Sequence, residues 1–160
     1  MVDTLGRGAS KLQQFLHDAG YAAEVQELPQ STRTAKEAAA AIGCELGQIA
    51  KSLALRDVNS GVWVLAIVAG DEQADIAKLD ADTGLTLALA DPKTIKRDLG
   101  FPIGGVPPVG HAQKLTTLLD RSLQRFDRVW AAAGSPNAVV GLAVSELEAM
   151  TTGRWLDLTS

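Results

Sequence analysis

The spacing of apolar positions along the chain predicts helices and strands that follow one another closely. Apolar residues recur every three or four positions in stretches typical of amphipathic helices, namely 10–19, 34–42 and 91–99. Shorter helical segments are expected at 71–80, 120–126 and 145–150. Runs of aliphatic and β-branched residues predict strands at 21–28, 49–56, 62–69, 85–90, 115–119, 128–133, 138–144 and 154–158. This order predicts an α/β (α+β) fold with helices around a mixed, partly antiparallel sheet.

Capping residues sharpen the expected ends of the helices. Three serine or threonine residues are followed three positions later by Glu or Gln, the pattern of a capping box: Ser10 with Gln13, Thr34 with Glu37, and Ser145 with Glu148. Gly43 follows the second helix where a C-cap glycine belongs. Pro92 follows Asp91 at the first position of the helix 91–99. The first two helices are interpreted as packing elements.

The predicted strand 49–56 contains a lysine on an apolar face. Alternation along a strand places Lys51 with Ile49, Leu53 and Leu55. The other face carries Ala50, Ser52, Ala54 and Arg56. A lysine that points toward aliphatic side chains is costly unless its ammonium reaches water or an anion. The alternation of side chains alone leaves two interpretations open for Lys51. It is either a side chain that extends to solvent at the start of the strand or a functional lysine.

The loop Gly104-Gly105-Val106-Pro107-Pro108-Val109-Gly110-His111 is neither an ordinary strand nor an ordinary helix. Its prolines lack backbone donors and have a fixed φ, while its glycines allow a ligand to approach the main chain. A tight connection between elements is one interpretation of such a loop. The other is a substrate cradle built from main-chain N–H groups. His111, one of two histidines in the chain, ends this loop.

Composition excludes several classes of function. The 160 residues suit a single domain spanning 1–160, with 46% hydrophobic and 21% charged residues. One cysteine rules out an internal disulfide, no apolar run is long enough for a membrane span, and we expect a cytoplasmic protein. A net charge of −4 argues against a broad nucleic-acid surface but allows a local basic patch. No spacing of His and Cys indicates a metal site, and no phosphate-loop or dinucleotide motif indicates a cofactor.

Four segments together resemble the YbaK/EbsC family, the editing domains associated with prolyl-tRNA synthetase. The segments are Gln48 to Leu53 around Lys51, Gly104 to His111, Ala133-Gly134-Ser135-Pro136-Asn137, and Glu146 to Leu158. The resemblance spans essentially the whole chain. It implies a compact α/β domain with a twisted, barrel-like mixed sheet.

The resemblance also implies a reaction and a set of site residues. Members of the family are trans-editing deacylases that hydrolyse the ester joining a wrong amino acid to the 3′ end of a tRNA. Lys51, Gly104, Gly105 and His111 are the catalytic candidates, and Val106, Pro107, Gly110, Gly134 and Asn137 are the substrate-binding candidates. The implied partners are the acceptor end of a mischarged tRNA, such as tRNA(Pro) carrying Ala, Ser, Thr, Cys or 2-aminobutyrate, and prolyl-tRNA synthetase. No metal, cofactor or membrane is implied.

Three questions stay open from the sequence. His111 is either a general base near neutral pH or a cap that bonds a carbonyl of its own loop. Lys93, Lys96 and Arg97 form either a solvated helix face or a contact to the phosphates of the acceptor stem. The whole chain is either a deacylase, a non-hydrolytic binding or regulatory module for aminoacyl-tRNA, or a hydrolase of small esters.

Overall fold

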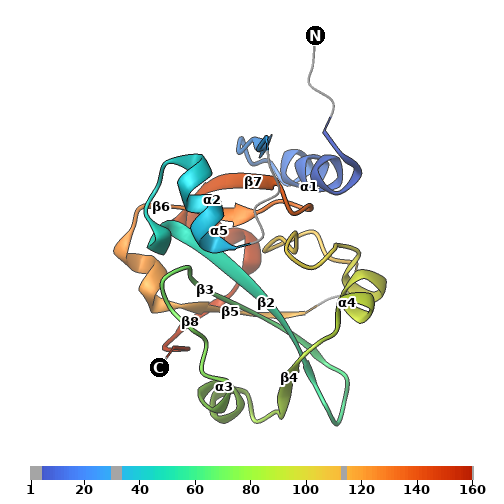
Figure 1. Ribbon diagram of the computed structural model, residues 1–160. Helices are drawn as coiled ribbons and strands as arrows, with labels where there is room; N and C mark the ends of the chain where they lie inside the picture. The colour runs from blue at the N-terminus through green and yellow to red at the C-terminus, as the bar shows by residue number, and fades with distance from the viewer. Residues whose placement is uncertain (1–4, 30–33, 113–114, 160) are drawn as a thin grey trace.

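A computed structural model describes residues 5–29, 34–112 and 115–159 (Figure 1). Its helices are α1 (Arg7–Asp18), α2 (Ala35–Ile42), α3 (Ile76–Thr83), α4 (Pro92–Leu99) and α5 (Val144–Thr151), with 3-10 turns η1 (Leu46–Gln48) and η2 (Arg121–Arg125). Its strands are β1 (Val25–Glu27), β2 (Ile49–Asp57), β3 (Trp63–Ala69), β4 (Leu87–Leu89), β5 (Thr116–Asp120), β6 (Arg128–Ala132), β7 (Ala138–Ala143) and β8 (Arg154–Leu156). Within these ranges no helix is long and apolar enough to cross a bilayer.

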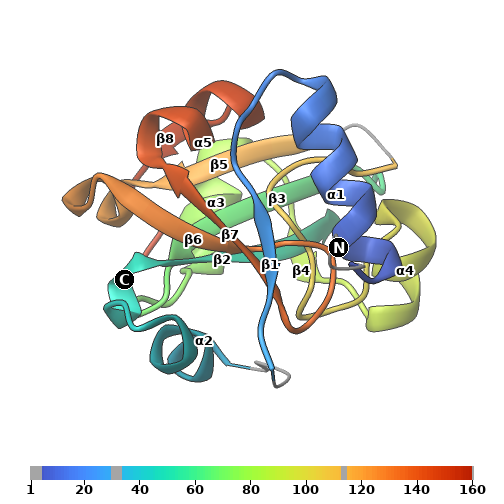
Figure 2. The same cartoon turned by 90° about the horizontal axis from the view of Figure 1, so that it is seen from above.

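The strands form one mixed sheet in the order β1-β7-β6-β2-β3-β5-β8, with β4 paired to β2 beside this path. Strand β2 runs antiparallel to β3 and parallel to β6, and β3 runs parallel to β5. Figure 2 shows the sheet twisted strongly, with α1 and α4 on one side of the molecule and β8 on the other. The expected α/β fold with a twisted mixed sheet and surrounding helices is confirmed.

Strand β3 lies at the centre of the core. All of its residues are buried, as the run of apolar residues on both faces predicts. One face of β3 packs in the larger cluster, which includes Leu65 and Ile67, and the other packs with β2 and α3 through Val64 and Val68. The side chains of β2 alternate in the same way, so that Ala50 and Ala54 face the larger cluster and Leu55 faces the smaller one.

Local capping signals define two of the helices correctly. The Thr34 hydroxyl accepts a hydrogen bond from the Glu37 N–H, and Gly43 ends α2 in the left-handed conformation at φ 84°. Asp91 caps α4 through the Thr94 N–H, with Pro92 at the first helical position. These boundaries follow from contacts within one turn of chain, which is why the sequence predicts them.

Other boundaries differ from the sequence-based prediction. The expected capping box at Ser10 is wrong, because α1 already begins at Arg7 and the Gln13 side chain instead bonds the main chain at Ala23 and Val25. The expected cap at Ser145 is also wrong, since the Glu146 carboxylate accepts from the Ala143 N–H one turn earlier. The strand at 21–28 is confined to Val25–Glu27, and the helix expected at 71–80 begins only at Ile76.

Candidate functional site

A gap in the strand pairing of β2 opens the candidate site. On the edge away from β3, β2 pairs with β6 only at Ile49 and Ala50, and with β4 only from Leu55 onward. Residues 51–53 therefore have no strand partner on that edge among the described residues. A cavity of about 220 Å³ that is partly open to solvent lies beside them, lined by residues of α2, β6, the loop at 104–106 and the segment 136–139.

Lys51 is the sole ionisable side chain on the described wall of this cavity. The side chain is half-buried, and its ammonium donates a hydrogen bond to the carbonyl oxygen of Glu72 at 2.7 Å. An ammonium has three N–H donors, so two remain for a ligand. The nearby Asp71 carboxyl has a pKa below its ordinary value, mainly because Arg125 hydrogen-bonds it and to a smaller extent because Lys51 is positive.

The glycine-proline loop lines the cavity with two residues whose main-chain N–H groups are unused. Gly104 and Val106 line it, and neither N–H has a hydrogen-bond acceptor within the described ranges. The Gly105 N–H is not available in the same way, since it donates to the Pro102 carbonyl at 3.0 Å. Gly104 has a φ of 83°, which a residue with a Cβ rarely adopts. Two residues with unused N–H groups therefore line the same cavity as Lys51.

Glycines hold this loop against its neighbours by direct contact of main chains. A Cβ on Gly105 would lie 2.6 Å from the Ser135 Cα, and one on Gly134 would lie 2.2 Å from the Gly8 carbonyl oxygen. The Gly134 N–H donates to the Gly105 carbonyl at 2.9 Å. Gly105 and Gly134 thus lie behind the cavity wall, where they fix the loop in place.

His111 is not among the residues that line the cavity. Its Nε2 is 2.7 Å from the Pro107 carbonyl oxygen, so Nε2 must carry the proton and donate it, because a carbonyl only accepts. Burial lowers the pKa of His111 from 6.5 to about 4, partly opposed by this hydrogen bond. The ring also packs edge-on against Phe101, with ring centroids 5.9 Å apart. A neutral histidine bonded within its own loop fits the capping interpretation better than that of a general base.

The remaining candidates from the sequence also lie beside the cavity wall rather than on it. Pro107 is buried, and Gly110 has a φ of 86° and packs near the α1 side chains Leu12 and Phe15. The Asn137 amide donates to the Leu28 carbonyl at 3.1 Å and accepts from the Ser135 hydroxyl at 3.0 Å. These hydrogen bonds join the turn after β6 to the end of β1, so Asn137 stabilises this turn.

Sequence reasoning missed several residues of the wall. Ala35 and Ala38 come from α2, interpreted as packing alone, and Trp130 comes from β6. Ser52 follows Lys51, and its hydroxyl is the single buried side-chain polar atom without a hydrogen-bond partner among the described residues. Small alanines on a helix and a serine inside an apolar strand are the sequence signals that could have indicated a cavity. The sequence alone does not show that these residues meet at one site. Nowhere in the described ranges do three or more His, Cys, Asp or Glu residues gather as metal ligands would.

Comparison with known proteins finds close relatives. The family model described as the aminoacyl-tRNA editing domain matches residues 29–150. The protein YwhH of Bacillus subtilis (strain 168) is 35% identical over 136 residues, which are 84% of this chain and 86% of YwhH. The multifunctional Ser/Thr-tRNA deacylase ProXp-y of Escherichia coli (strain K12) is 39% identical over 96 residues, which are 58% of each protein.

Solved structures share the fold over nearly the full length. A structure described as a candidate trans-editing enzyme for prolyl-tRNA synthetase superimposes with a TM-score of 0.93 at 41% identity. The match covers 98% of this chain and 99% of the other.

Proposed function

The chain belongs to the aminoacyl-tRNA editing domain family, and we propose that it hydrolyses the ester bond between a mischarged amino acid and the 3′ end of a tRNA. The observation that carries this proposal is that Lys51 lines one small cavity together with Gly104 and Val106, whose N–H groups have no acceptor among the described residues. The relative ProXp-y, named as a Ser/Thr-tRNA deacylase, supports the same reaction.

The free N–H groups are suited to stabilise the charge that develops during hydrolysis. Water attacks the ester carbonyl carbon, and the carbonyl oxygen becomes an oxyanion. The N–H groups of Gly104 and Val106 donate to that oxygen, and one such donor contributes about 2.7–4 kcal/mol in enzymes where it has been removed. When the intermediate collapses, the carbon–oxygen bond to the ribose breaks and the ribose oxygen takes a proton. The products are a free amino acid and an uncharged tRNA.

Lys51 supplies the positive charge of the site. Its two remaining N–H donors hold either the oxyanion or the terminal phosphate of the tRNA in a half-buried setting, where charges interact more strongly than in water. The described wall carries no other ionisable side chain, so the attacking water receives no protein base there. The ester is already activated, and the neighbouring ribose hydroxyl is the group placed to assist the water.

Cavity size favours small amino acids. A volume of about 220 Å³ is below the range of about 300–1,000 Å³ that drug-sized ligands occupy. Alanine, serine, threonine, cysteine and 2-aminobutyrate are of suitable size for this volume. The substrate class we propose is therefore a tRNA, with tRNA(Pro) as the first candidate, that carries one of these amino acids. A cytoplasmic location and an association with prolyl-tRNA synthetase follow from the same proposal.

A deacylation panel tests this function. The purified protein is incubated with tRNA(Pro) carrying each of the five small amino acids and, as a control, with correctly charged Pro-tRNA(Pro). The expected result is release of at least one small amino acid with Pro-tRNA(Pro) spared. Protection of every ester against spontaneous hydrolysis would instead indicate a non-hydrolytic binding module. Equal turnover of tRNA-linked and free aminoacyl esters would indicate a general esterase.

A further inference from the structure

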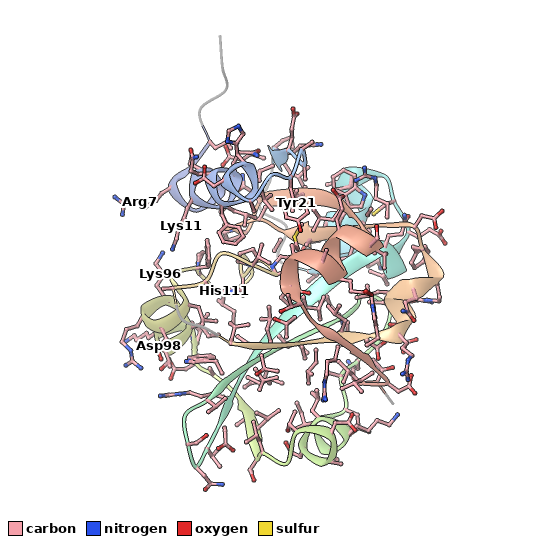
Figure 3. The ribbon with its side chains drawn as sticks, turned by 180° about the vertical axis from the view of Figure 1, so that it is seen from behind. Arg7, Lys11, Tyr21, Lys96, Asp98 and His111 are labelled. Carbon is pink, nitrogen blue, oxygen red and sulfur yellow. The ribbon has the colours of Figure 1, made fainter. Side chains whose placement is uncertain are left out.

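Three basic side chains form a group on the side of the molecule where α1 and α4 lie. Arg7 and Lys11 are one turn apart on α1, and Lys96 is in the last turn of α4. All three residues are exposed. Figure 3 shows Lys11 and Lys96 extending toward the same space between the two helices, with Arg7 beyond Lys11. We refer to Arg7, Lys11 and Lys96 as the basic face.

Contacts fix the position of Lys11 at the end of α4. Its Nζ lies 4.5 Å from the centroid of the Phe101 ring, and a Cβ on Gly100 would approach that Nζ to 2.7 Å. The Gly100 N–H in turn donates to the Lys96 carbonyl at 3.1 Å. The ammonium of Lys11 therefore lies beside the last turn of α4, where Lys96 is located.

No acidic side chain neutralises the basic face within the described ranges. Neither Arg7, Lys11 nor Lys96 forms an ion pair there. The acidic groups nearby have other partners. Asp98 pairs with Arg97 at 2.8 Å and accepts from the Trp63 indole N–H. The Glu27 carboxylate lies at the start of α1, where it accepts from the neutral Gly6 N–H and forms no ion pair with Arg7 within the described ranges. The basic face is thus an unpaired positive surface on a chain of net charge −4.

Helix stabilisation explains only part of this arrangement. Lys11 and Lys96 lie at the C-terminal end of α4, where positive charge interacts favourably with the helix dipole. Arg7 lies in the first turn of α1, where the dipole disfavours a positive charge. The helix dipole therefore does not account for Arg7, and an anionic ligand outside the protein is a partner that would stabilise it there.

The main chain beside Arg7 contacts the segment that lies behind the candidate cavity. Gly8, next to Arg7, packs main chain to main chain against Gly134, and Gly134 bonds Gly105 behind the cavity wall. A phosphate held by Arg7 would thus lie on a helix that packs against the support of the loop at 104–106. Such a connection suits a surface that aligns a polymer whose end enters the cavity.

We infer that the basic face binds the phosphate backbone of the tRNA acceptor stem and so directs its 3′ end into the cavity. This inference rests on the proposed function for the identity of the nucleic acid. Phosphates are the main source of affinity in complexes of proteins with nucleic acids, and their contacts to Arg and Lys set position rather than sequence preference. The basic face therefore controls affinity and orientation, while the cavity selects the amino acid.

Charge reversal tests the inference directly. A triple variant carries Arg7→Glu, Lys11→Glu and Lys96→Glu. The matched control carries Lys78→Glu, Arg121→Glu and Arg154→Glu, which change the net charge equally on α3, η2 and β8, away from α1 and α4 (Figure 1). Fluorescence anisotropy measures the Kd of each variant for an acceptor-stem hairpin that carries no amino acid, over a range of salt concentrations. A second variant, Arg7→Gln with Lys11→Met and Lys96→Gln, retains the packing on Phe101 if the first variant does not fold.

The expected result is at least a tenfold increase in Kd for the basic-face variant relative to the control. The slope of log K against log salt should fall by roughly 2 to 3, since each lost phosphate contact removes about 0.7–0.9. If the basic-face variant and the control had equal Kd values for the hairpin, the inference would be overturned. An acidic protein would then be the partner to test for this surface. Hydrolysis of a short aminoacyl-adenosine ester, which has no stem, should be unchanged in both variants. Absence of that hydrolysis in the unmodified protein would contradict the proposed function alone, because hairpin binding is measured without it.

Discussion

The Lys51 ammonium donates a hydrogen bond to the main-chain carbonyl oxygen of Glu72 across 2.7 Å. The Glu72 N–H itself donates to Ala69 at the end of β3, so the acceptor belongs to a fixed turn. The lysine is therefore held in position before substrate arrives, with two N–H donors still available. This preorganisation makes Lys51 the first residue to test.

Replacement of Lys51 should abolish deacylation without unfolding the protein. We expect Lys51→Ala to reduce kcat by about 10² to 10³ or more, the range found when one donor to an oxyanion is removed. Lys51→Met, which keeps the apolar stem, should lose as much activity. Lys78→Ala is the matched control, because Lys78 also donates to a main-chain carbonyl but lies on α3 outside the cavity. Activity retained in both Lys51 variants would refute the role of this side chain.

A methyl group on Gly105 should displace the loop that lines the candidate site. We expect Gly105→Ala to lower both Tm and kcat, because its Cβ would lie 2.6 Å from the Ser135 main chain and force the two loops apart. Gly20→Ala is the control, since Gly20 has a φ of 87° and open space around it. That change should cost about 1–2 kcal/mol of stability with kcat unchanged. Equal kcat in the two variants would show that the loop contact does not support the site.

Stability should decrease in mildly acidic solution because of His111. Its pKa is about 4 in the folded protein and near 6.5 unfolded, so below pH 6.5 the unfolded chain binds a proton that the folded protein does not. Stability is therefore complete above pH 6.5 and is lost as the pH falls toward 4, by about 3 kcal/mol in total. The carboxyls of Asp57, Asp71 and Asp91, whose pKa values lie below 3.8, act only at lower pH.

Urea unfolding at pH 7 and pH 4.5 measures this effect. His111→Gln retains an N–H donor for Pro107 but does not titrate, so the difference between the two pH values should shrink in that variant. Deacylation by His111→Gln should follow the same pH profile as the unmodified protein if the ring caps its loop. A loss of kcat at every pH would identify His111 as the general base instead.

Removal of the Ser52 hydroxyl should maintain or increase stability. A buried hydroxyl without a partner costs about 1–3 kcal/mol, so Ser52→Ala should raise the free energy of unfolding or leave it unchanged. Ser135→Ala is the matched control, because its hydroxyl donates to Asn137 at 3.0 Å and its loss should cost about 1 kcal/mol. Chemical denaturation distinguishes them. A destabilised Ser52→Ala would mean that the hydroxyl has a partner in solution.

The sequence predicts those parts of the structure that depend on nearby residues. The Thr34 cap, the Asp91-Pro92 start and the alternation that puts Lys51 with Leu53 and Leu55 all follow from one or two turns of chain. Ser10 shows the limit of this reasoning, because α1 extends one turn earlier where Gly8 packs on Gly134.

The candidate site was only partly predictable because it forms where distant segments meet. Lys51, Gly104 and Val106 belong to one cavity, as the resemblance suggests. The gap in pairing at residues 51–53 depends on where β6 ends and β4 begins, which no local pattern encodes. The hydrogen bond from His111 to the Pro107 carbonyl could not be predicted from the sequence either, because the same residues would allow the ring to point toward the loop or away from it.

Main-chain contacts among Gly8, Gly105 and Gly134 join the beginning, the middle and the last third of the chain. Contacts between residues so far apart in sequence close long loops and tend to form late in folding. During synthesis Lys51 and its strand leave the ribosome well before Gly134 is made. We therefore expect a nascent chain to contain Lys51 before the loop at 104–106 is held in place, so that the proposed ester hydrolysis requires the completed fold.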